Sequence, residues 1–94
     1  MANHPSALKR ARQSQRRRMR NKFWRTRVRN VVKAVRKALQ AGDPQLAQEA
    51  LAKAVPVIDK AASKGVIHWR NAARKISRLS RQVHALSESR SQTA

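Results

Sequence analysis

Three side chains near the end of the sequence have the types and spacing of a hydrolase triad. Ser80, His84 and Glu88 stand four residues apart, so a helix would place a nucleophile, a base and an orienting acid on one face. Such a triad also needs an oxyanion hole and a pocket that excludes water. A chain of 94 residues with only 18 Leu, Ile, Val and Phe residues is too small to enclose one. We therefore predict that the row is an ordinary helix surface and that the protein is not an enzyme.

The sequence also lacks the residue patterns that hold metals or phosphate-containing cofactors. It has no cysteine, its three histidines (His4, His68 and His84) are scattered, and its four acidic residues never stand at metal-ligand spacing. The two glycines are 23 residues apart, so no glycine-rich loop can cradle a phosphate. We predict no metal, no cofactor and no small-molecule substrate.

The chemistry that the sequence does offer is cationic. There are 23 Lys and Arg residues against four Asp and Glu residues, which gives a formal net charge of +19. Solubility requires far less charge, so the excess predicts a strongly acidic partner, either nucleic acid or an anionic membrane. A membrane partner is not predicted, because no apolar run approaches the length of a membrane-spanning helix. An amphipathic membrane helix is not predicted either, since Met19 is the one bulky apolar residue among residues 9–22.

The basic residues concentrate in two segments. Residues 1–42 carry a net charge of +14, residues 43–64 carry none, and residues 65–94 carry +5. The first segment includes a basic arm, residues 1–23, whose cations are Lys9, Arg10, Arg12, Arg16, Arg17, Arg18, Arg20 and Lys22. The second includes a row at helical spacing, namely Arg70, Arg74, Arg78 and Arg81, flanked by Lys75. Because Arg binds phosphate through paired hydrogen bonds, both groups are predicted to contact a phosphate backbone. An ordinary solvated helix face is the alternative for the row.

Glycine and proline positions divide the chain into three predicted helices. Nothing between Ser6, a suitable N-cap, and Gly42, a suitable left-handed C-terminal cap, breaks a helix. Asp43 and Pro44 have the types of an N-cap and a first helical residue, which predicts a second helix over residues 44–63. A third helix is predicted over residues 68–87. Since no window alternates as a strand would, the predicted fold class is all-α.

Apolar residues recur at three- and four-residue steps in each predicted helix, which indicates an antiparallel three-helix bundle. The expected core comprises Trp24, Val28, Val31, Val32, Val35 and Leu39 from the first helix; Leu46, Ala47, Ala50, Leu51, Ala54, Ile58, Ala61 and Ala62 from the second; and Trp69, Ala72, Ala73, Ile76, Leu79, Val83 and Leu86 from the third. Many of these residues are alanine, so we expect a thin core and a stability of only a few kcal/mol.

The chain is predicted to form a single domain with three parts. These are the basic arm, which extends the first helix beyond the bundle, the bundle itself over residues 24–87, and a frayed tail over residues 88–94. The arm has no apolar face to dock against the bundle. We therefore expect it to fray in the free protein and to become helical when phosphates neutralise it.

The aromatic residues have two possible roles. Trp24 and Trp69 could stack on nucleic-acid bases, but their helical spacing favours burial in the bundle. Phe23 points away from Trp24 and is predicted to make a contact outside the core. His68, at the opening of the third helix, is predicted to be a capping or RNA-contacting residue.

Several short segments resemble one bacterial family. They are Met1-Ala2-Asn3, Ser6-Ala7, Lys9-Arg10, Ala41-Gly42-Asp43, Pro56-Val57-Ile58-Asp59, Lys64-Gly65-Val66-Ile67-His68 and Ala72-Ala73-Arg74, with the similarity ending at Leu79. Together they are similar to the family of the twentieth small-subunit ribosomal protein. The segment Trp69-Arg70-Asn71 departs from the Lys-Asn-Lys type of sequence that is usual in that family.

The resemblance implies a three-helix bundle with an extended first helix that binds 16S ribosomal RNA directly during assembly. It implies a position low in the small subunit, between the 5′ domain and the long penultimate stem. It also implies a cytoplasmic, ribosome-bound protein with a structural role, and we expect no homo-oligomer. The complete set of expected RNA contacts is Asn3, Ser6, Lys9, Arg10, Arg12, Arg16, Arg17, Arg18, Arg20, Lys22, Arg25, Arg29, Lys64, His68, Arg70, Arg74, Lys75, Arg78 and Arg81. A DNA-compacting architectural protein is the alternative, because charge alone does not distinguish RNA from DNA.

Overall fold

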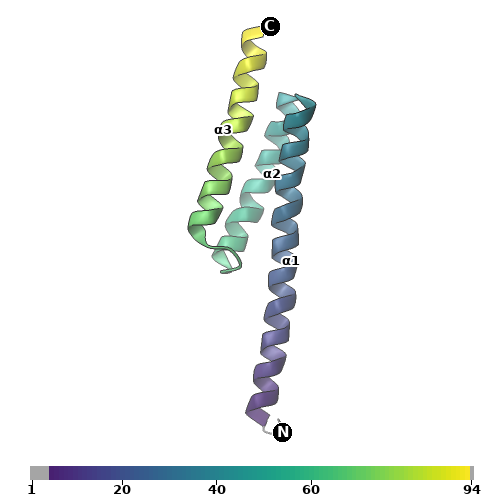
Figure 1. The fold of residues 1–94 in the computed structure, drawn as a ribbon, viewed down its shortest axis with the longest axis vertical. Helices are drawn as coiled ribbons and strands as arrows, with labels where there is room; N and C mark the ends of the chain where they lie inside the picture. The colour runs from purple at the N-terminus through teal and green to yellow at the C-terminus, as the bar shows by residue number, and fades with distance from the viewer. Residues whose placement is uncertain (1–4, 94) are drawn as a thin grey trace.

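The protein is an all-α bundle of three helices. The computed structural model describes residues 5–93, and the surroundings of side chains as far as residue 89. Helix α1 spans Pro5–Ala41, α2 spans Pro44–Ser63 and α3 spans Trp69–Thr93. The helices run up, down and up, with α1 and α3 lying on either side of α2 (Figure 1). The predicted fold class and helix order are confirmed.

The turn between α1 and α2 depends on a left-handed glycine followed by an aspartate cap. Gly42 has φ of 71°, and its N–H donates to the carbonyl of Leu39 at 3.1 Å. The next N–H, that of Asp43, reaches back to the carbonyl of Ala38 at 3.4 Å, which completes a Schellman motif. The Asp43 carboxylate then accepts hydrogen bonds from the backbone N–H groups of residues 45 and 46, at 3.1 and 3.2 Å.

The end of α2 repeats the same motif. Gly65 has φ of 75° and donates its N–H to the carbonyl of Ala62 at 3.0 Å. The N–H of Val66 donates to the carbonyl of Ala61 at 3.0 Å, which turns the Val66 side chain back into the core, where it is 7% exposed. His68 then caps α3, because its Nδ1 accepts the backbone N–H of Arg70 at 3.1 Å.

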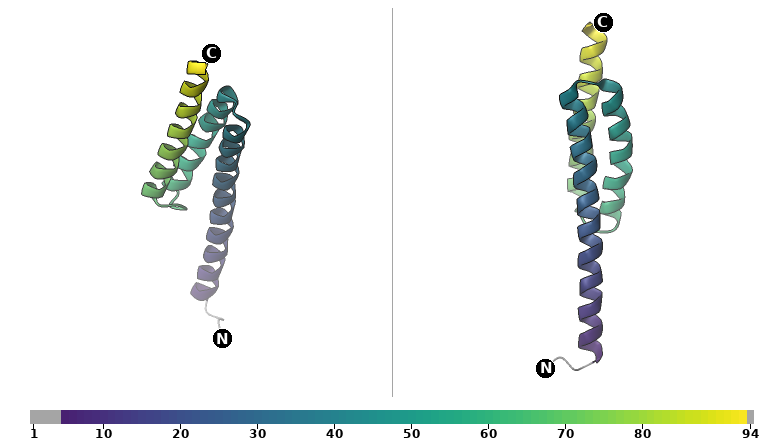
Figure 2. Two further views of the ribbon diagram at one scale, coloured as in Figure 1. Left: turned by 45° about the horizontal axis from the view of Figure 1, so that its top comes forward. Right: turned by 90° about the vertical axis from the view of Figure 1, so that its right-hand side faces the viewer.

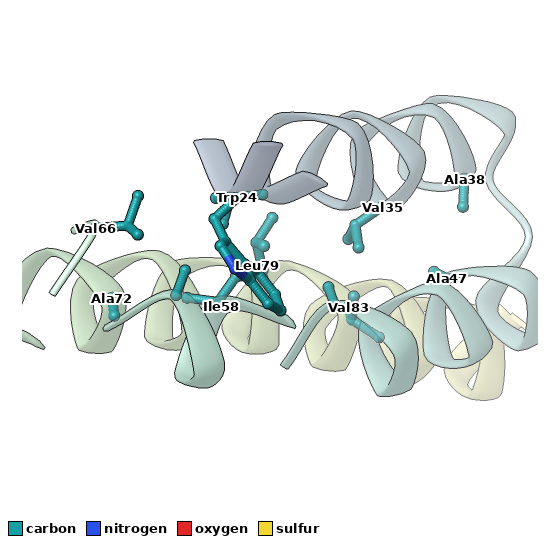
Figure 3. Close-up of a cluster of buried hydrophobic side chains, with 12 residues drawn as sticks. Trp24, Val35, Ala38, Ala47, Ile58, Val66, Ala72, Leu79 and Val83 are labelled. Carbon is teal, nitrogen blue, oxygen red and sulfur yellow. The ribbon is translucent and has the colours of Figure 1, made fainter. Parts of the chain in front are cut away.

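The core is a narrow seam of small and medium side chains. Its buried members are Trp24, Val28, Val35, Ala38, Ala47, Ala54, Ile58, Ala61, Val66, Ala72, Leu79 and Val83. Figure 3 shows the Trp24 indole beside Ile58 and Leu79, with Val66 at one end of the seam and Ala38 and Ala47 at the other. Val31, Val32, Leu39, Ala50, Leu51, Ala62, Ile76 and Leu86 pack against it while partly buried, as expected.

Three residues that were expected in the core lie outside it. Leu46 is 48% exposed in the first turn of α2, and Ala73 is exposed on α3. Trp69 is 63% exposed, since Val66 from the preceding loop occupies that end of the core instead. Trp69 continues the three- and four-residue spacing of Ala72 and Ile76, but this periodicity gave no information on where the seam ends.

Two helix boundaries differ from the expected ones. Helix α1 spans Pro5–Ala41, so Ser6, the expected N-cap, lies within its first described turn, where proline at position 5 is also well tolerated. Helix α3 continues to Thr93, so its predicted end at Ser87 is wrong. Residues 88–93 contain neither glycine nor proline, and nothing in them stops the helix beyond the bundle.

The long α1 gives the molecule its shape. Its 37 residues span about 55 Å at 1.5 Å per residue, whereas the 20 residues of α2 span about 30 Å. The principal extents are 70 × 21 × 16 Å, and the N-terminal half of α1 stands alone below the bundle (Figure 2). Across residues 5–93, no helix has the combination of length and apolar content that membrane crossing requires.

Candidate nucleic-acid interface

The Lys and Arg residues from Lys9 to Arg81 have no carboxylate partner in the described structure. Every Lys and Arg from Lys9 to Arg81 is exposed, and no charged side chain is buried. The one ion pair among the described side chains joins His84 to Glu88 and involves neither Lys nor Arg. These cations therefore retain their full charge and hydrogen-bonding capacity for an external anion.

The described part of the basic arm is a solvent-exposed helix. All eight of its predicted contact cations, from Lys9 to Lys22, are exposed on a rod that no other helix covers. Arg16, Arg17 and Arg20 line one shallow surface hollow together with Gln13. Ser6 lies at the start of this rod, and Asn3 lies outside the described residues. Because cations surround the axis, the arm can neutralise phosphates on more than one side.

A second cationic surface lies in the groove between α1 and α3. Two hollows of about 270 and 460 Å³ share Val32, Arg36 and Lys75, so they adjoin one another, and we call the two together the basic groove. Its cations are Arg25, Arg29, Lys33 and Arg36 from α1 and Arg74, Lys75 and Arg78 from α3. Val28, Val32, Ile67 and Leu79 supply apolar lining, and no acidic residue lines either hollow.

The α1 side of the basic groove continues into the basic arm. Arg25, Arg29, Lys33 and Arg36 follow one another at steps of four, four and three, which keeps them on one helix face. The same steps lead back to Lys22 and Arg18 on the arm. One uninterrupted helix therefore carries a single stripe of cations, which we call the α1 stripe, from the arm into the groove.

Sequence reasoning missed part of this groove. Arg25 and Arg29 were predicted contacts, but Lys33 and Arg36 were not, although they stand at the same three- and four-residue steps. Applying to α1 the periodicity argument that identified the row on α3 would have found them.

The predicted row on α3 is divided between two surfaces. Arg74 and Arg78 face the basic groove together with Lys75. Arg81 lies on the other side of α3, in a hollow shared with α2. Arg70 lies in the first turn of α3, with its guanidinium carbon 5.4 Å from the ring centroid of Trp69. The row is exposed, as predicted, but only its middle belongs to the groove.

Lys64 belongs to a third cluster, on the α1–α2 side of the molecule. Its ammonium lies 5.5 Å from the ring centroid of Trp24, where Lys60 and Arg27 also approach at 5.7 and 5.2 Å. Cation–π attraction explains how three cations gather over the ring of a buried indole. Arg27 also lies 5.6 Å from the ring of Phe23, which is 55% exposed and so lies outside the core as predicted. Phe23 does not point away from Trp24, however, because the two rings meet edge to face with their centroids 5.7 Å apart.

The apparent catalytic row has the exposure of an ordinary surface. His84 Nε2 lies 3.1 Å from Glu88 Oε1, but their side chains are 73% and 63% exposed. Catalytic hydrogen bonds gain their strength in a dry, preorganised site, which this helix face does not provide. Within the described residues, no three His, Cys, Asp or Glu side chains gather as a metal site.

Comparison with known proteins shows to which family the chain belongs. A family model for ribosomal protein S20 matches residues 2–84, from the start of the basic arm into α3. The chain belongs to the ribosomal protein S20 family. The resemblance seen in the sequence is thereby confirmed, and the S20 match includes every predicted contact residue.

Several S20 relatives are similar over nearly their whole length. The small ribosomal subunit protein bS20 of Nitratidesulfovibrio vulgaris (strain DP4) is 60% identical over 84 residues, which cover 89% of this chain and 97% of the relative. The protein of the same name from Maridesulfovibrio salexigens is 60% identical over 86 residues, covering 92% and 99%. That of Geotalea daltonii is 56% identical over 87 residues, covering 93% and 100%.

Proposed function

We propose that this S20-family protein is a structural constituent of the small ribosomal subunit. It binds 16S ribosomal RNA directly, bridges separate RNA helices through their phosphates and thereby aids subunit assembly. Its place of action is the bacterial ribosome in the cytoplasm. Family membership and the names of the relatives support RNA over the DNA-compacting alternative.

The observation that carries the proposal is the presence of two unpaired cationic surfaces on one helical scaffold. The basic arm stands clear of the bundle, and the basic groove lies on the bundle itself. One continuous helix, α1, contributes to both. Two phosphate backbones bound at these places would be held at a fixed separation and angle.

The chemistry of these surfaces suits an RNA duplex. A-form RNA presents mainly phosphates, 2′-hydroxyls and its overall shape, because its major groove is too narrow for side chains to read. Exposed Arg and Lys residues along a helix satisfy phosphates without reading bases. We therefore expect many phosphate contacts and few contacts to base edges.

Salt-dependent binding provides the first test of this proposal. The arm variant R16A/R17A/R18A/R20A and the groove variant R29Q/K33Q/R36Q should both bind 16S ribosomal RNA more weakly than the unaltered chain. The slope of log K for RNA binding against log salt concentration should also be less steep in both variants. The slope should fall by roughly 0.7–0.9 for each phosphate that the variant no longer neutralises. A filter-binding or fluorescence-anisotropy titration at several salt concentrations measures both quantities.

A matched pair of single variants controls for charge. K33Q removes a groove lysine and K53Q makes the same change at an exposed position of α2, away from both surfaces. K33Q should weaken binding and flatten the salt dependence, and K53Q should leave both nearly unchanged. Equal effects from the two variants would show that only total charge matters.

Nucleotide-protection mapping tests the bridge itself. If the two surfaces hold different RNA helices, the arm variant loses protection in one element and the groove variant loses it in another. Loss of the same nucleotides in both variants would contradict bridging while leaving RNA binding intact.

A further inference from the structure

The first turn of α3 carries an exposed aromatic side chain that phosphate binding does not explain. Trp69 is 63% exposed, although tryptophan has more apolar surface to bury than almost any other residue. A single exposed apolar side chain is common in proteins, so exposure alone indicates no function. Trp69 differs from such cases because both of its sequence neighbours contact its ring.

His68 supports the indole from one side. The two rings are stacked, with centroids 5.6 Å apart and planes inclined by 30°. The imidazole is itself held in place, because its Nδ1 accepts the backbone N–H of Arg70 as the cap of α3. The backbone carbonyl of His68 accepts the N–H of Ala72 at 3.0 Å, which fixes the main chain at the same residue. The helix cap therefore orients the aromatic pair.

Arg70 adds a cation to the same platform. Its guanidinium carbon lies 5.4 Å from the indole centroid, and its side chain is exposed. A nucleotide combines a flat base with an adjacent phosphate. The guanidinium lies over the indole ring, so it can hold the phosphate of a nucleotide whose base stacks on the exposed part of the indole.

We propose that Trp69, supported by His68 and Arg70, is a stacking platform for an unpaired RNA base. This inference rests on the proposed function, since it assumes that RNA covers this end of the molecule. Bases within a duplex are stacked on one another and cannot lie flat on a side chain, so the ligand is a bulged, looped or terminal nucleotide.

The position of the platform agrees with such a ligand. Ile67, two residues before Trp69, lines the basic groove beside Arg25 and Lys75. An RNA strand that follows the groove cations past Ile67 would therefore come close to Trp69. Phosphate contacts in the groove would position the strand, and Trp69 would select a point where one base is unpaired.

Tryptophan fluorescence tests the contact directly. The chain has two tryptophans, and Trp24 is buried in the core. Titration of the full chain with protein-free 16S ribosomal RNA should quench the emission, because a stacked base quenches an indole. In the W69F variant, which retains only Trp24, saturation with the same RNA should leave the emission nearly unchanged.

Affinity measurements test whether the contact contributes to binding. W69L, which keeps an apolar side chain but cannot stack, should bind about 5- to 150-fold more weakly, while W69F should recover most of the affinity. The salt dependence should not change in either variant, because both keep every cation. L46A, which shortens an exposed leucine in the first turn of α2, is the control and should bind normally.

The possible outcomes separate this inference from the proposed function. If the unaltered chain does not bind the RNA, the proposed function fails. If it binds but Trp69 is not quenched, or if W69L binds as tightly as the unaltered chain, the platform is wrong and the proposed function stands. Quenching that occurs only in assembled subunits, and not with protein-free RNA, would mean that Trp69 contacts another subunit component and would likewise overturn the inference.

Discussion

At the scale of single residues, the chain reversal before α3 depends on one backbone conformation. Gly65 has φ of 75°, and a Cβ added there would meet no atom within 4 Å. A side chain at this position is therefore opposed by the left-handed backbone alone and not by lack of space.

This separation of causes leads to a prediction for two variants. G65A should lower the free energy of unfolding by about 1–2 kcal/mol, because alanine disfavours the left-handed region. G65N should cost less, since asparagine tolerates that region despite its larger side chain. Urea unfolding followed by circular dichroism measures both. A larger loss for G65N than for G65A would show that space, not conformation, limits the position.

The same residues show what the sequence could and could not predict. A glycine after a helical segment is typical of a helix end, and the Asp43–Pro44 pair is typical of a helix start. The positions of the turns could therefore be predicted from residue type. The exposure of Trp69 did not follow, because it depends on the loop turning Val66 into the core. The packing of Val66 is a tertiary effect, and the spacing of apolar residues within a helix does not show how a loop packs against the core.

At the scale of elements, the single helix α1 has two segments of different character, an exposed N-terminal segment and a C-terminal segment that packs in the bundle. Its buried residues begin at Trp24, and the preceding 19 residues of the helix include no buried side chain. Within the arm, Arg12, Arg16 and Arg20 stand four residues apart and repel one another along one face. Only intrinsic helix propensity, which is favourable for arginine, opposes this repulsion.

We therefore predict that the arm opens independently of the bundle in the free protein. Hydrogen exchange should show fast amide exchange over residues 5–22 and slower exchange over residues 28–39, which pack against α2. Binding of 16S ribosomal RNA should slow exchange in the arm, because phosphates neutralise the repulsion. Arm amides that are already as slow as those of the bundle in low salt would contradict this prediction.

Helix ends were predicted well only where the sequence marks them. The ends of α1 and α2 carry left-handed glycines, and both were placed correctly. The end of α3 carries no such residue, so the change to polar composition after Ser87 was misread as the end of the helix. Polar composition shows that a segment is not buried, but it does not show that the segment is not helical.

At the scale of the whole molecule, stability depends on very few large side chains. Ile58 and Val35 are the largest fully buried side chains, and much of the remaining core is alanine. The sequence predicted this thin core from its alanine content. Ile76, which also belonged to the expected core, is only half-buried and should matter less than Ile58.

A conservative change in the core should therefore be clearly measurable. I58V should lower the free energy of unfolding by about 0.5–1.5 kcal/mol, a large share of the few kcal/mol expected for a bundle of this size. L46A, an exposed position of the same helix, should change it by no more than about 0.5 kcal/mol. Thermal melting compares the two, and equal effects would show that the seam around Ile58 is not the core.

The α1 stripe has a consequence for how the chain tolerates length changes. Each residue in an α-helix turns the chain by about 100°, so one residue added between Lys22 and Arg25 would swing Arg18 and Lys22 about a quarter of a turn from the opening of the groove. Seven added residues, close to two full turns, would restore the angular phase and move the arm about 10 Å outward. The uninterrupted α1 thus fixes both the distance and the rotational angle between the cations of the arm and those of the groove, and the spacing of the cations in the sequence determines both.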